Sequence, residues 1–317
     1  FILGAFLLAC RLAYSYSPSP VIISLLIVIG AIASEHRFSV RPEVVSWVLM
    51  MILVTLLEHG ARTDSSGTDP GFKRLYLLPV IMLFWVNIQG IFIIGLGVIF
   101  CYILDDLLRN RRIHKPLWLY GAGSLVAVFI NPYGWKGALF PVILSTRLSG
   151  ENRFASSIGE FLSPWNMPFP DPDQGTWAML LAYYILAILV PLLLLLTIRK
   201  RPIRHWLLTV MFGVLAAQAI RNIPVYFLVT LPVAAAAIQD IRCYFRLKQE
   251  SPGQPGFLIR ISTRMMAPGA ALVIVLGIIL NLSILNSNWH RVTRKQWRPG
   301  FKLTNVFLPV KAATFLT

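Results

Sequence analysis

The chain has 317 residues, of which 56% are hydrophobic and only 13% are charged. Soluble domains carry about 25% charged residues, so this composition excludes an ordinary soluble domain and is typical of an integral membrane protein. The net charge of +16 does not indicate a nucleic-acid partner, because no basic stripe or nucleic-acid motif accompanies it. Lysines and arginines that flank membrane helices and contact lipid headgroups account for the charge.

Apolar stretches recur along the whole chain and predict an all-α polytopic membrane protein with about ten transmembrane helices. The predicted segments are 1–15, 19–34, 43–58, 75–88, 90–107, 117–132, 176–198, 205–220, 222–240 and 267–285. We expect one transmembrane domain over 1–285, in which the Pro-rich, amphipathic stretch 133–175 is an external loop lying on the membrane surface. Residues 286–317 are expected to begin an extracytoplasmic C-terminal segment.

The two ends of the chain and its cysteines add little to this interpretation. The sequence begins at Phe1 inside an apolar stretch, without a signal-peptide pattern, and we expect a fragment that lacks both ends. Cys10, Cys101 and Cys243 are too far apart in sequence to indicate a metal site or a disulfide framework.

Basic clusters between the apolar segments predict the orientation in the membrane. They lie at 73–74, 109–115, 199–204 and 242–264, and alternating spans place all four on one side. The positive-inside rule makes that side the cytoplasm, so we expect a protein of the bacterial inner membrane. The basic tail after residue 285 would lie outside, which is expected only if it leads into an exported segment.

Five polar motifs then fall together on the extracytoplasmic side. They are EHRFSVRPE (35–43), WVNIQG (85–90), NPYGWK (131–136), GEFLSPW (159–165) and RNIP (221–224). Polar groups at membrane depth are costly and usually line a cavity or a site. Their common side is the strongest functional indication in the sequence.

The arginines of these motifs are candidates for binding phosphate or pyrophosphate, since guanidinium presents a planar fork of donors. Arg37 and Arg41 precede a helix, although Pro42 and Glu43 also have a purely structural explanation as a helix start. Arg221, followed by Asn222, interrupts two apolar segments and must be solvated or paired. A structural salt bridge from Arg221 to Glu43 or Glu160 is the alternative.

Glu160 lies in an otherwise apolar external segment. It is a candidate base, metal ligand or arginine partner, and a plain ion pair with Arg147, Arg153 or Arg221 is the alternative. A divalent metal ion stays open as a cofactor, but no set of metal ligands is predicted.

Amide and aromatic side chains form a second group of candidates for binding a sugar or headgroup. Asn87 and Gln89 end a helix before Gly90, where capping of a tight hairpin is the alternative, and Trp85 is expected to stack on a ring. Asn131 and Tyr133 lie in a turn by their chemistry and complete the group.

The order of the motifs FSVRPE, LLPVIMLFWVNIQG, NPYGW, EFLSPW and QAIRNIPVYFLVTLPVAA resembles a group of bacterial membrane proteins related to the GT-C glycosyltransferases, including the protein-mannosyltransferase-like branch. The resemblance covers roughly residues 35–240, and LPVKAATFL near the end also fits. Gln89 stands where histidine is common in that group, and Phe161 stands where tryptophan commonly follows the glutamate.

The resemblance implies transfer of a sugar from a polyprenyl-phosphate donor to a lipid, glycan or protein on the extracytoplasmic face. It implies inverting displacement, with Arg41 and Arg221 stabilising the departing phosphate and with Glu160 or Glu43 orienting them or holding a metal. The family's catalytic carboxylate lies in the first external loop, and no residue here matches it, so Glu160 and Glu43 are only candidates.

Other functions remain open at this point. Nucleotide-binding, serine-nucleophile and zinc-protease motifs are absent from the sequence. The main alternative is a transporter or flippase of an anionic lipid or solute, although residues 1–130 and 176–285 show no convincing repeat of the kind that transporters have. A glycan polymerase or ligase and a non-catalytic scaffold are further alternatives.

Overall fold

The computed structural model describes residues 1–16, 19–38, 41–63, 74–109, 114–148, 159–167 and 177–249. Within these ranges the chain forms helices and no strand, which confirms the all-α prediction. The tenth predicted segment, 267–285, and the C-terminal segment 286–317 lie outside the described residues.

Ten α-helices and four short 3-10 helices make up the described part of the chain. The α-helices are α1 (Ile2–Tyr14), α2 (Pro20–Ser34), α3 (Glu43–Thr63), α4 (Leu77–Ile88), α5 (Phe92–Arg109), α6 (Lys115–Ala127), α7 (Trp135–Leu148), α9 (Trp177–Leu196), α10 (Ile203–Gln218) and α11 (Ile223–Gln249). The 3-10 helices are η1 (Glu35–Arg37), η4 (Gly159–Phe161), η5 (Pro164–Asn166) and η6 (Ile220–Asn222).

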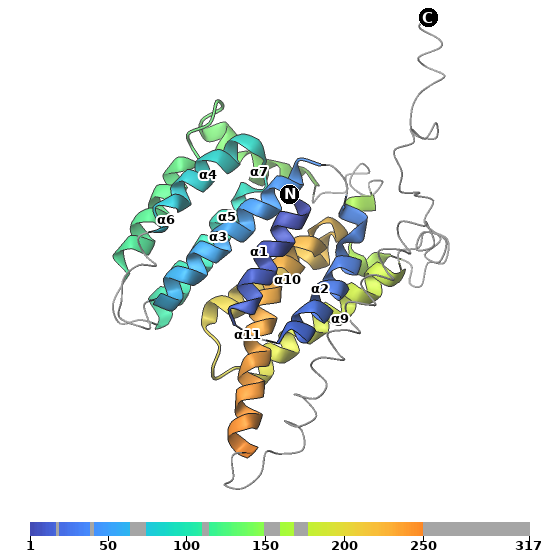
Figure 1. The fold of residues 1–317 in the computed structure, drawn as a ribbon. Helices are drawn as coiled ribbons and strands as arrows, with labels where there is room; N and C mark the ends of the chain where they lie inside the picture. The colour runs from blue at the N-terminus through green and yellow to red at the C-terminus, as the bar shows by residue number, and fades with distance from the viewer. Residues whose placement is uncertain are drawn as a thin grey trace, which may run out of the picture.

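Helix α11 is the centre of one half of the bundle. It packs against α1, α2, α9 and α10, while α4, α5 and α6 pack together in the other half and α3 contacts both (Figure 1). The first part of α11 is rich in small and β-branched residues and is almost completely buried, from Ile223 to Ala237. Where α2 crosses it, Gly30 is required, because a Cβ atom there would lie 2.1 Å from the ring of Phe227.

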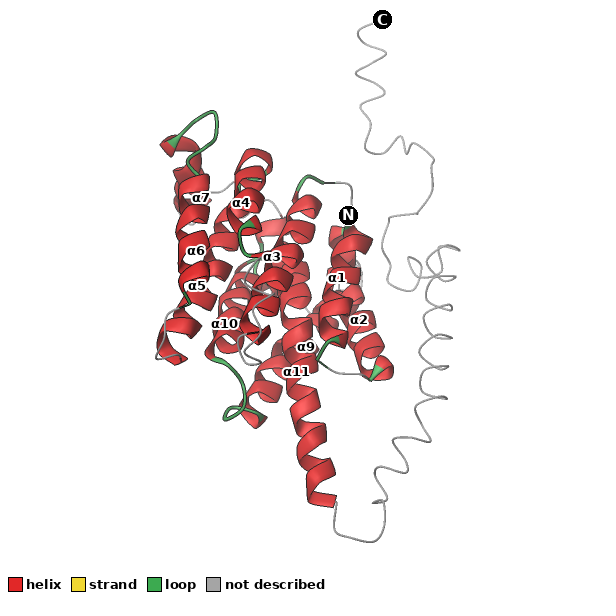
Figure 2. Ribbon diagram, turned by 60° about the vertical axis from the view of Figure 1, so that its left-hand side comes forward, coloured by secondary structure: helices red, strands yellow, loops and turns green. Residues whose placement is uncertain are grey.

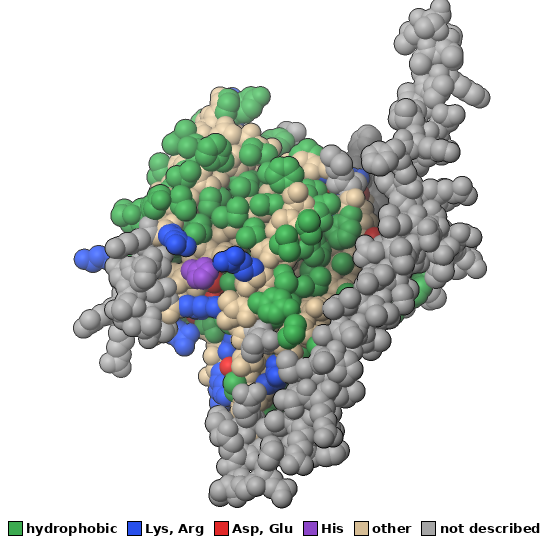
Figure 3. Space-filling view, viewed as in Figure 1, with side chains coloured by type: hydrophobic (Ala, Val, Ile, Leu, Met, Phe, Trp, Pro, Cys, Tyr) green, Lys and Arg blue, Asp and Glu red, His purple; other side chains and the backbone are tan. Residues whose placement is uncertain are grey.

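Among the described residues, four helical stretches are long and apolar enough to cross a membrane: 20–37, 43–62, 177–196 and 220–245. Large hydrophobic side chains such as Phe84, Leu119 and Ile188 are exposed on the helices, and hydrophobic side chains dominate the upper part of the face in Figure 3. An exposed apolar surface of this extent is expected for a protein that lies in a bilayer.

The predicted count of ten spans is not confirmed. Each of the first nine predicted segments contains a helix, but several helices are short. Helices α4 and α10 have 12 and 16 residues, or about 18 and 24 Å at 1.5 Å per residue, against a hydrocarbon core of about 30 Å.

The stretch 133–175 was expected to be a surface loop, but its first part is a helix. Helix α7 occupies Trp135–Leu148 and carries Pro141 inside it. Apolar residues such as Leu139, Phe140 and Val142 are exposed on it. Its position on the membrane surface stays a prediction, and residues 149–158 and 168–175 lie outside the described part of the chain.

Two ends of the bundle carry its connections (Figure 2). At one end α2 passes through η1 towards α3, α4 turns into α5, and α10 turns through η6 into α11; we call this the Arg37 end. The opposite end, where α3 and α5 finish and α10 begins, we call the Glu58 end. Glu58 is about 22 Å from Glu43 along α3, at 1.5 Å per residue.

Candidate functional site

The Arg37 end holds a cluster of five charged side chains from four separate segments: Arg37, Arg41, Glu43, Glu160 and Arg221. Arg37 is at its centre. Its side chain is only 2% exposed, and it pairs with Glu43 in the first turn of α3 and, at 2.7 Å from Nη1 to Oε2, with Glu160 in η4. A buried guanidinium is stable only when it is paired in this way, so Arg37 joins two segments that are distant in sequence.

Arg41 and Glu160 form the exposed side of this cluster. They pair with each other, and their side chains are 42% and 32% exposed. Partial burial tends to raise the pKa of Glu160, but hydrogen bonds and charge from Arg37 and Arg41 outweigh it, so the pKa lies below its ordinary value. Glu160 is therefore an ionised acceptor for two arginines.

The ion pair predicted as the structural alternative for Glu160 is present, but with other partners. The expected partners were Arg147, Arg153 or Arg221, whereas Arg37 and Arg41 hold the carboxylate. The side chain of Arg147 and all of Arg153 lie outside the described part of the structure. The family resemblance did imply that Glu160 or Glu43 orients Arg41, and the Arg41–Glu160 pair is present; the pairing of Glu160 with Arg37 was not expected.

Arg221 differs from the other two arginines, because none of the described carboxylates lies within ion-pairing distance of it. The predicted alternative, a salt bridge to Glu43 or Glu160, is thus not formed. Its guanidinium carbon instead lies 4.2 Å from the centre of the Phe161 ring, as in a cation–π contact. Phe161 stands where tryptophan commonly follows the glutamate, and it still provides an aromatic ring for this contact.

The segment that carries Glu160 and Phe161 is attached to the end of α10. The amide of Ile220 donates to the carbonyl of Leu162 at 3.1 Å, and Ser163 Oγ donates to the carbonyl of Ala217 at 2.7 Å. Asn222 Nδ2 donates to the carbonyl of Leu215 at 2.8 Å and thereby caps α10. These bonds hold Arg221 beside the Arg37 cluster.

The charges of the cluster do not cancel, since three arginines face two glutamates. One positive charge remains, and the guanidinium without a carboxylate partner is that of Arg221. In addition, Arg37 Nε is buried without an acceptor in the described residues. An anion with several oxygens would complete the charge balance and provide acceptors.

A cavity of about 550 Å³ lies at the same end of the bundle, between the α4–α5 turn and the start of α7. The predicted residues Asn87, Gln89, Asn131 and Tyr133 all line it, together with Lys136 and apolar side chains. Its volume lies in the range of ligand pockets, about 300–1,000 Å³. The sequence thus predicted a common side for these residues, and the structure shows a common cavity.

The two asparagines of this cavity also have structural roles. Asn87 Nδ2 donates to the carbonyls of Leu83 and Ile130, which joins the end of α4 to the end of α6. Asn131 Nδ2 donates to the carbonyls of Val128 and Gly134, and Gly134 has a φ of +54°. The predicted turn is confirmed, and Asn131 is occupied in holding it.

Trp85 does not have the predicted role. Its side chain is completely buried, and its Nε1 donates to Ser46 Oγ at 2.9 Å, so no ring face is exposed for a sugar. Ser46 is one turn beyond Glu43 on α3. Trp85 therefore joins α4 to α3 inside the bundle.

A second polar cluster, which was not predicted from the sequence, lies at the Glu58 end. Glu58 is 3% exposed and accepts hydrogen bonds from Tyr16 and Tyr102 and an ion pair from Arg204 at 2.9 Å. Arg204 also pairs with Asp105 at 2.7 Å. The available signal was the presence of charged residues within apolar helices, as in α3 and α5.

His205 belongs to this second cluster, with Nε2 lying 3.4 Å from Glu58, while its buried Nδ1 has no described partner. The adjacent cavity measures only about 10 Å³, which is room for one water at most. The cluster is too enclosed to receive a substrate. Its ion pairs instead fit a structural role, in which they hold α3, α5 and α10 together.

Among the residues described, no group of three histidines, cysteines or carboxylates is placed to hold a metal ion. Glu43 and Glu160 are both engaged by arginines. Comparison with protein-family models gives no match to this chain, and a search of curated proteins finds no significant relative.

Proposed function

We propose that the protein is a membrane glycosyltransferase that transfers a sugar from a polyprenyl-phosphate donor to a lipid, glycan or protein acceptor. In this proposal the Arg37 end faces the extracytoplasmic side of the bacterial inner membrane. The observation that carries the proposal is the arginine-rich cluster at that end, with its unbalanced positive charge on Arg221.

The cluster has the chemistry that a phosphate leaving group requires. Arg41 is substantially exposed, and no described carboxylate lies within ion-pairing distance of Arg221, although the charges of Glu43 and Glu160 reach it. Both would donate to the donor phosphate and stabilise its charge as the glycosidic bond breaks. Arg37, buried between Glu43 and Glu160, holds the segments that carry these groups.

The cavity at the same end of the bundle would hold the sugar or the acceptor. Amide and hydroxyl groups suit the hydrogen-bonding pattern of a sugar, and Gln89, Tyr133 and Lys136 line the cavity. In this proposal the phosphate and the sugar or acceptor are bound at the same end of the bundle, the phosphate by the arginine cluster and the sugar or acceptor by the cavity.

Glu160 fits the role of orienting arginines better than the role of a general base. Arg37 and Arg41 occupy its two oxygens, and its pKa is lowered by them after the opposing effect of burial. An efficient base has a pKa near the working pH. Glu43 is likewise bonded to Arg37.

A transporter or flippase of an anionic lipid or solute is the second candidate. The observation in its favour is the buried Glu58–Arg204–His205 cluster at the opposite end, because ionisable groups within a membrane bundle often mark transport pathways. Its enclosure by Tyr16 and Tyr102 argues against it.

The deciding experiment uses the purified protein in proteoliposomes with radiolabelled polyprenyl-phosphate sugars and a bacterial membrane lipid extract. Label transferred from the donor to any acceptor is the expected result. Donor that stays intact but becomes protected from reagents outside the vesicle would reject the transferase and favour transport. The variant Arg221→Ala should abolish transfer, while Arg199→Ala, an exposed arginine at the other end, should not.

A further inference from the structure

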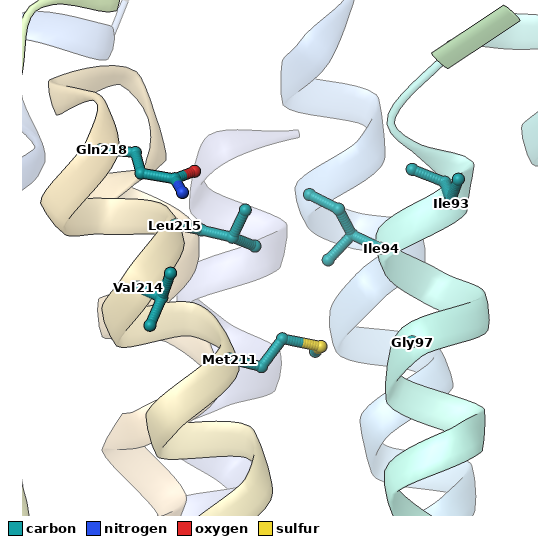
Figure 4. Close-up of a pocket in the computed structure, with 7 residues that line it drawn as sticks. All are labelled: Ile93, Ile94, Gly97, Met211, Val214, Leu215 and Gln218. Atoms are coloured by element: carbon teal, nitrogen blue, oxygen red, sulfur yellow. The ribbon is translucent and has the colours of Figure 1, made fainter. Parts of the chain in front are cut away.

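Two hollows in the described part of the structure differ in the charge of their lining. The groove between α5 and α10 measures about 410 Å³, and Gln218 is the one polar side chain among its described lining residues (Figure 4). The cavity of about 550 Å³ between the α4–α5 turn and the start of α7 is lined by Lys136 as well as by amide side chains; we call it the Lys136 cavity. Both volumes lie in the range of ligand pockets, but of the two only the Lys136 cavity presents a charge to a ligand.

Three side chains of the Lys136 cavity have donors that bind nothing else among the described residues. The amide nitrogens of Asn87 and Asn131 each donate to two backbone carbonyls, so they have no N–H left for a ligand. The Gln89 amide, the Tyr133 hydroxyl and the Lys136 ammonium also line the cavity, and no hydrogen bond joins them to other groups in the described part of the chain. These three groups are available to a ligand.

Lys136 leaves the cavity with a positive charge. Among the described residues that line it, none is acidic, and the Lys136 ammonium lies 5.9 Å from the centre of the Trp135 ring, which is neutral. Lys136 lies in the first turn of α7, which contains no acidic residue, and the helix dipole disfavours a cation there. Lys136 is therefore not placed to stabilise α7, and an anionic group with several oxygens would suit the three free donors.

The surroundings of the cavity indicate that this anion belongs to a lipid. Tyr133 and Phe140 line the cavity and are 78% and 53% exposed, and Trp135 beside them is 62% exposed. Aromatic side chains collect in this way at the membrane–water interface. A soluble anion would leave these rings uncovered, whereas a phospholipid would place its phosphate in the cavity and its acyl chains against Phe140 and the exposed apolar side of α7.

We propose that the Lys136 cavity binds the headgroup of an anionic phospholipid, with the phosphate on Lys136 and the other polar atoms on Gln89 and Tyr133. A zwitterionic lipid fits less well, because its own cation would meet the ammonium where no described carboxylate offsets it. The binding site does not depend on the proposed function. Its use as the acceptor site rests on that function, and it would narrow the acceptor to an anionic lipid.

The test compares two lysine substitutions. Lys136→Gln removes the charge of the cavity and breaks none of the described hydrogen bonds or ion pairs, so the fold should be kept. Lys115→Gln is the matched control, because Lys115 is also exposed in the first turn of a helix, α6, which begins beside the end of α5 at the Glu58 end.

The probe is phosphatidylglycerol, titrated into the purified full chain in neutral detergent, with bound lipid counted by native mass spectrometry. We expect Lys136→Gln to weaken the tightest binding by about tenfold, as for the loss of a charged hydrogen-bond donor. Lys115→Gln should leave it unchanged, and Lys136→Arg, which keeps the charge, should retain most of it. Unchanged binding by Lys136→Gln, or an equal loss in Lys115→Gln or Lys136→Arg, would overturn the inference.

Two competitors distinguish a lipid from a soluble anion. Phosphatidylcholine should not displace phosphatidylglycerol at equal concentration, because it carries no net charge. Glycerol phosphate has the charged group without acyl chains and should compete only at much higher concentration. Displacement by glycerol phosphate at equal concentration would make this a site for a soluble anion and overturn the assignment to a lipid.

The failure of this inference can be told apart from the failure of the proposed function. If the wild type transfers sugar but Lys136→Gln binds phosphatidylglycerol normally, the lipid site is wrong and the transferase stands. If Lys136→Gln loses the lipid and the wild type transfers no sugar, the transferase is wrong and the lipid site stands.

Discussion

The partners of Arg221 decide whether this residue has a structural role or is free to bind a ligand. The sequence marked it as an arginine between two apolar segments, where pairing and ligand binding were both reasonable. Its guanidinium lies over Phe161 rather than on a carboxylate. By contrast Arg37, from the same group of candidates, is fully buried and paired twice, so the two arginines should respond differently to substitution.

Replacement of Arg221 by alanine is predicted to weaken donor binding while leaving the fold intact. A hydrogen bond to a charged group is worth about 1.5–3 kcal/mol, which corresponds to roughly a tenfold to hundredfold loss of affinity. Unfolding in detergent should change little, since no described ion pair is lost. A large fall in melting temperature would instead assign Arg221 a structural role.

Glu160 is predicted to make the stability depend on pH in the acidic range. Its pKa in the folded protein lies below the ordinary value of 4.5, so its contribution is fully present above that value and is lost as the pH falls through the lowered pKa. The difference in melting temperature between wild type and Glu160→Gln should therefore shrink as the pH is lowered from 6 to about 3. A difference in melting temperature that stays the same from pH 6 to about 3 would contradict this role of Glu160.

At the scale of helices, close packing and buried charge hold the bundle together. Gly30 permits the approach of α2 to α11, and the Glu58 cluster joins α3, α5 and α10. Both features lie inside apolar segments whose sequences otherwise predict only a membrane helix. Each makes a prediction about stability rather than about ligand binding.

Gly30→Ala is predicted to destabilise the protein by about 1–3 kcal/mol, because the added methyl group meets the buried ring of Phe227. Gly4→Ala is the matched control, since a Cβ atom there would lie 3.9 Å from Val48, an ordinary contact. Alanine is also the better helix former, so the control should be neutral or stabilising. Thermal unfolding in detergent measures both, and equal effects would show that α2 and α11 are less closely packed.

Glu58→Gln is predicted to cost about 3–5 kcal/mol, because it leaves Arg204 in a buried site with one charged partner fewer. The control is Asp240→Asn, which removes the partner of Arg201 in a pair that is more exposed. A smaller effect is expected there. If Glu58→Gln has the same free energy of unfolding as the wild type, the ion pairs of the cluster do not stabilise the packing of α3, α5 and α10.

At the scale of the whole molecule, the two polar ends make the orientation testable. In a variant without its own cysteines, Pro132→Cys marks the Arg37 end and Lys200→Cys marks the Glu58 end, and both positions are exposed. A membrane-impermeant maleimide should label Pro132→Cys in intact bacterial spheroplasts and Lys200→Cys only after permeabilisation. The reverse pattern would place the proposed site in the cytoplasm.

The sequence by itself determined the membrane class, the helical fold and the positions of most helices, because apolar composition and segment length are local properties. It also predicted that Arg37, Arg41, Glu43, Glu160 and Arg221 lie at one end, since alternating spans bring distant loops to the same side. It did not give the bounds of helix α7 within the Pro-rich stretch 133–175.

Only the tertiary structure decided which charges pair, which side chains are buried and where cavities form. Trp85 was a reasonable ring-stacking residue until its burial against Ser46 was seen. The Glu58 cluster and the α5–α10 groove depend on contacts between segments about 100 residues apart or more. Such contacts follow from how helices pack, and packing is a property of pairs of surfaces that no single segment of sequence contains.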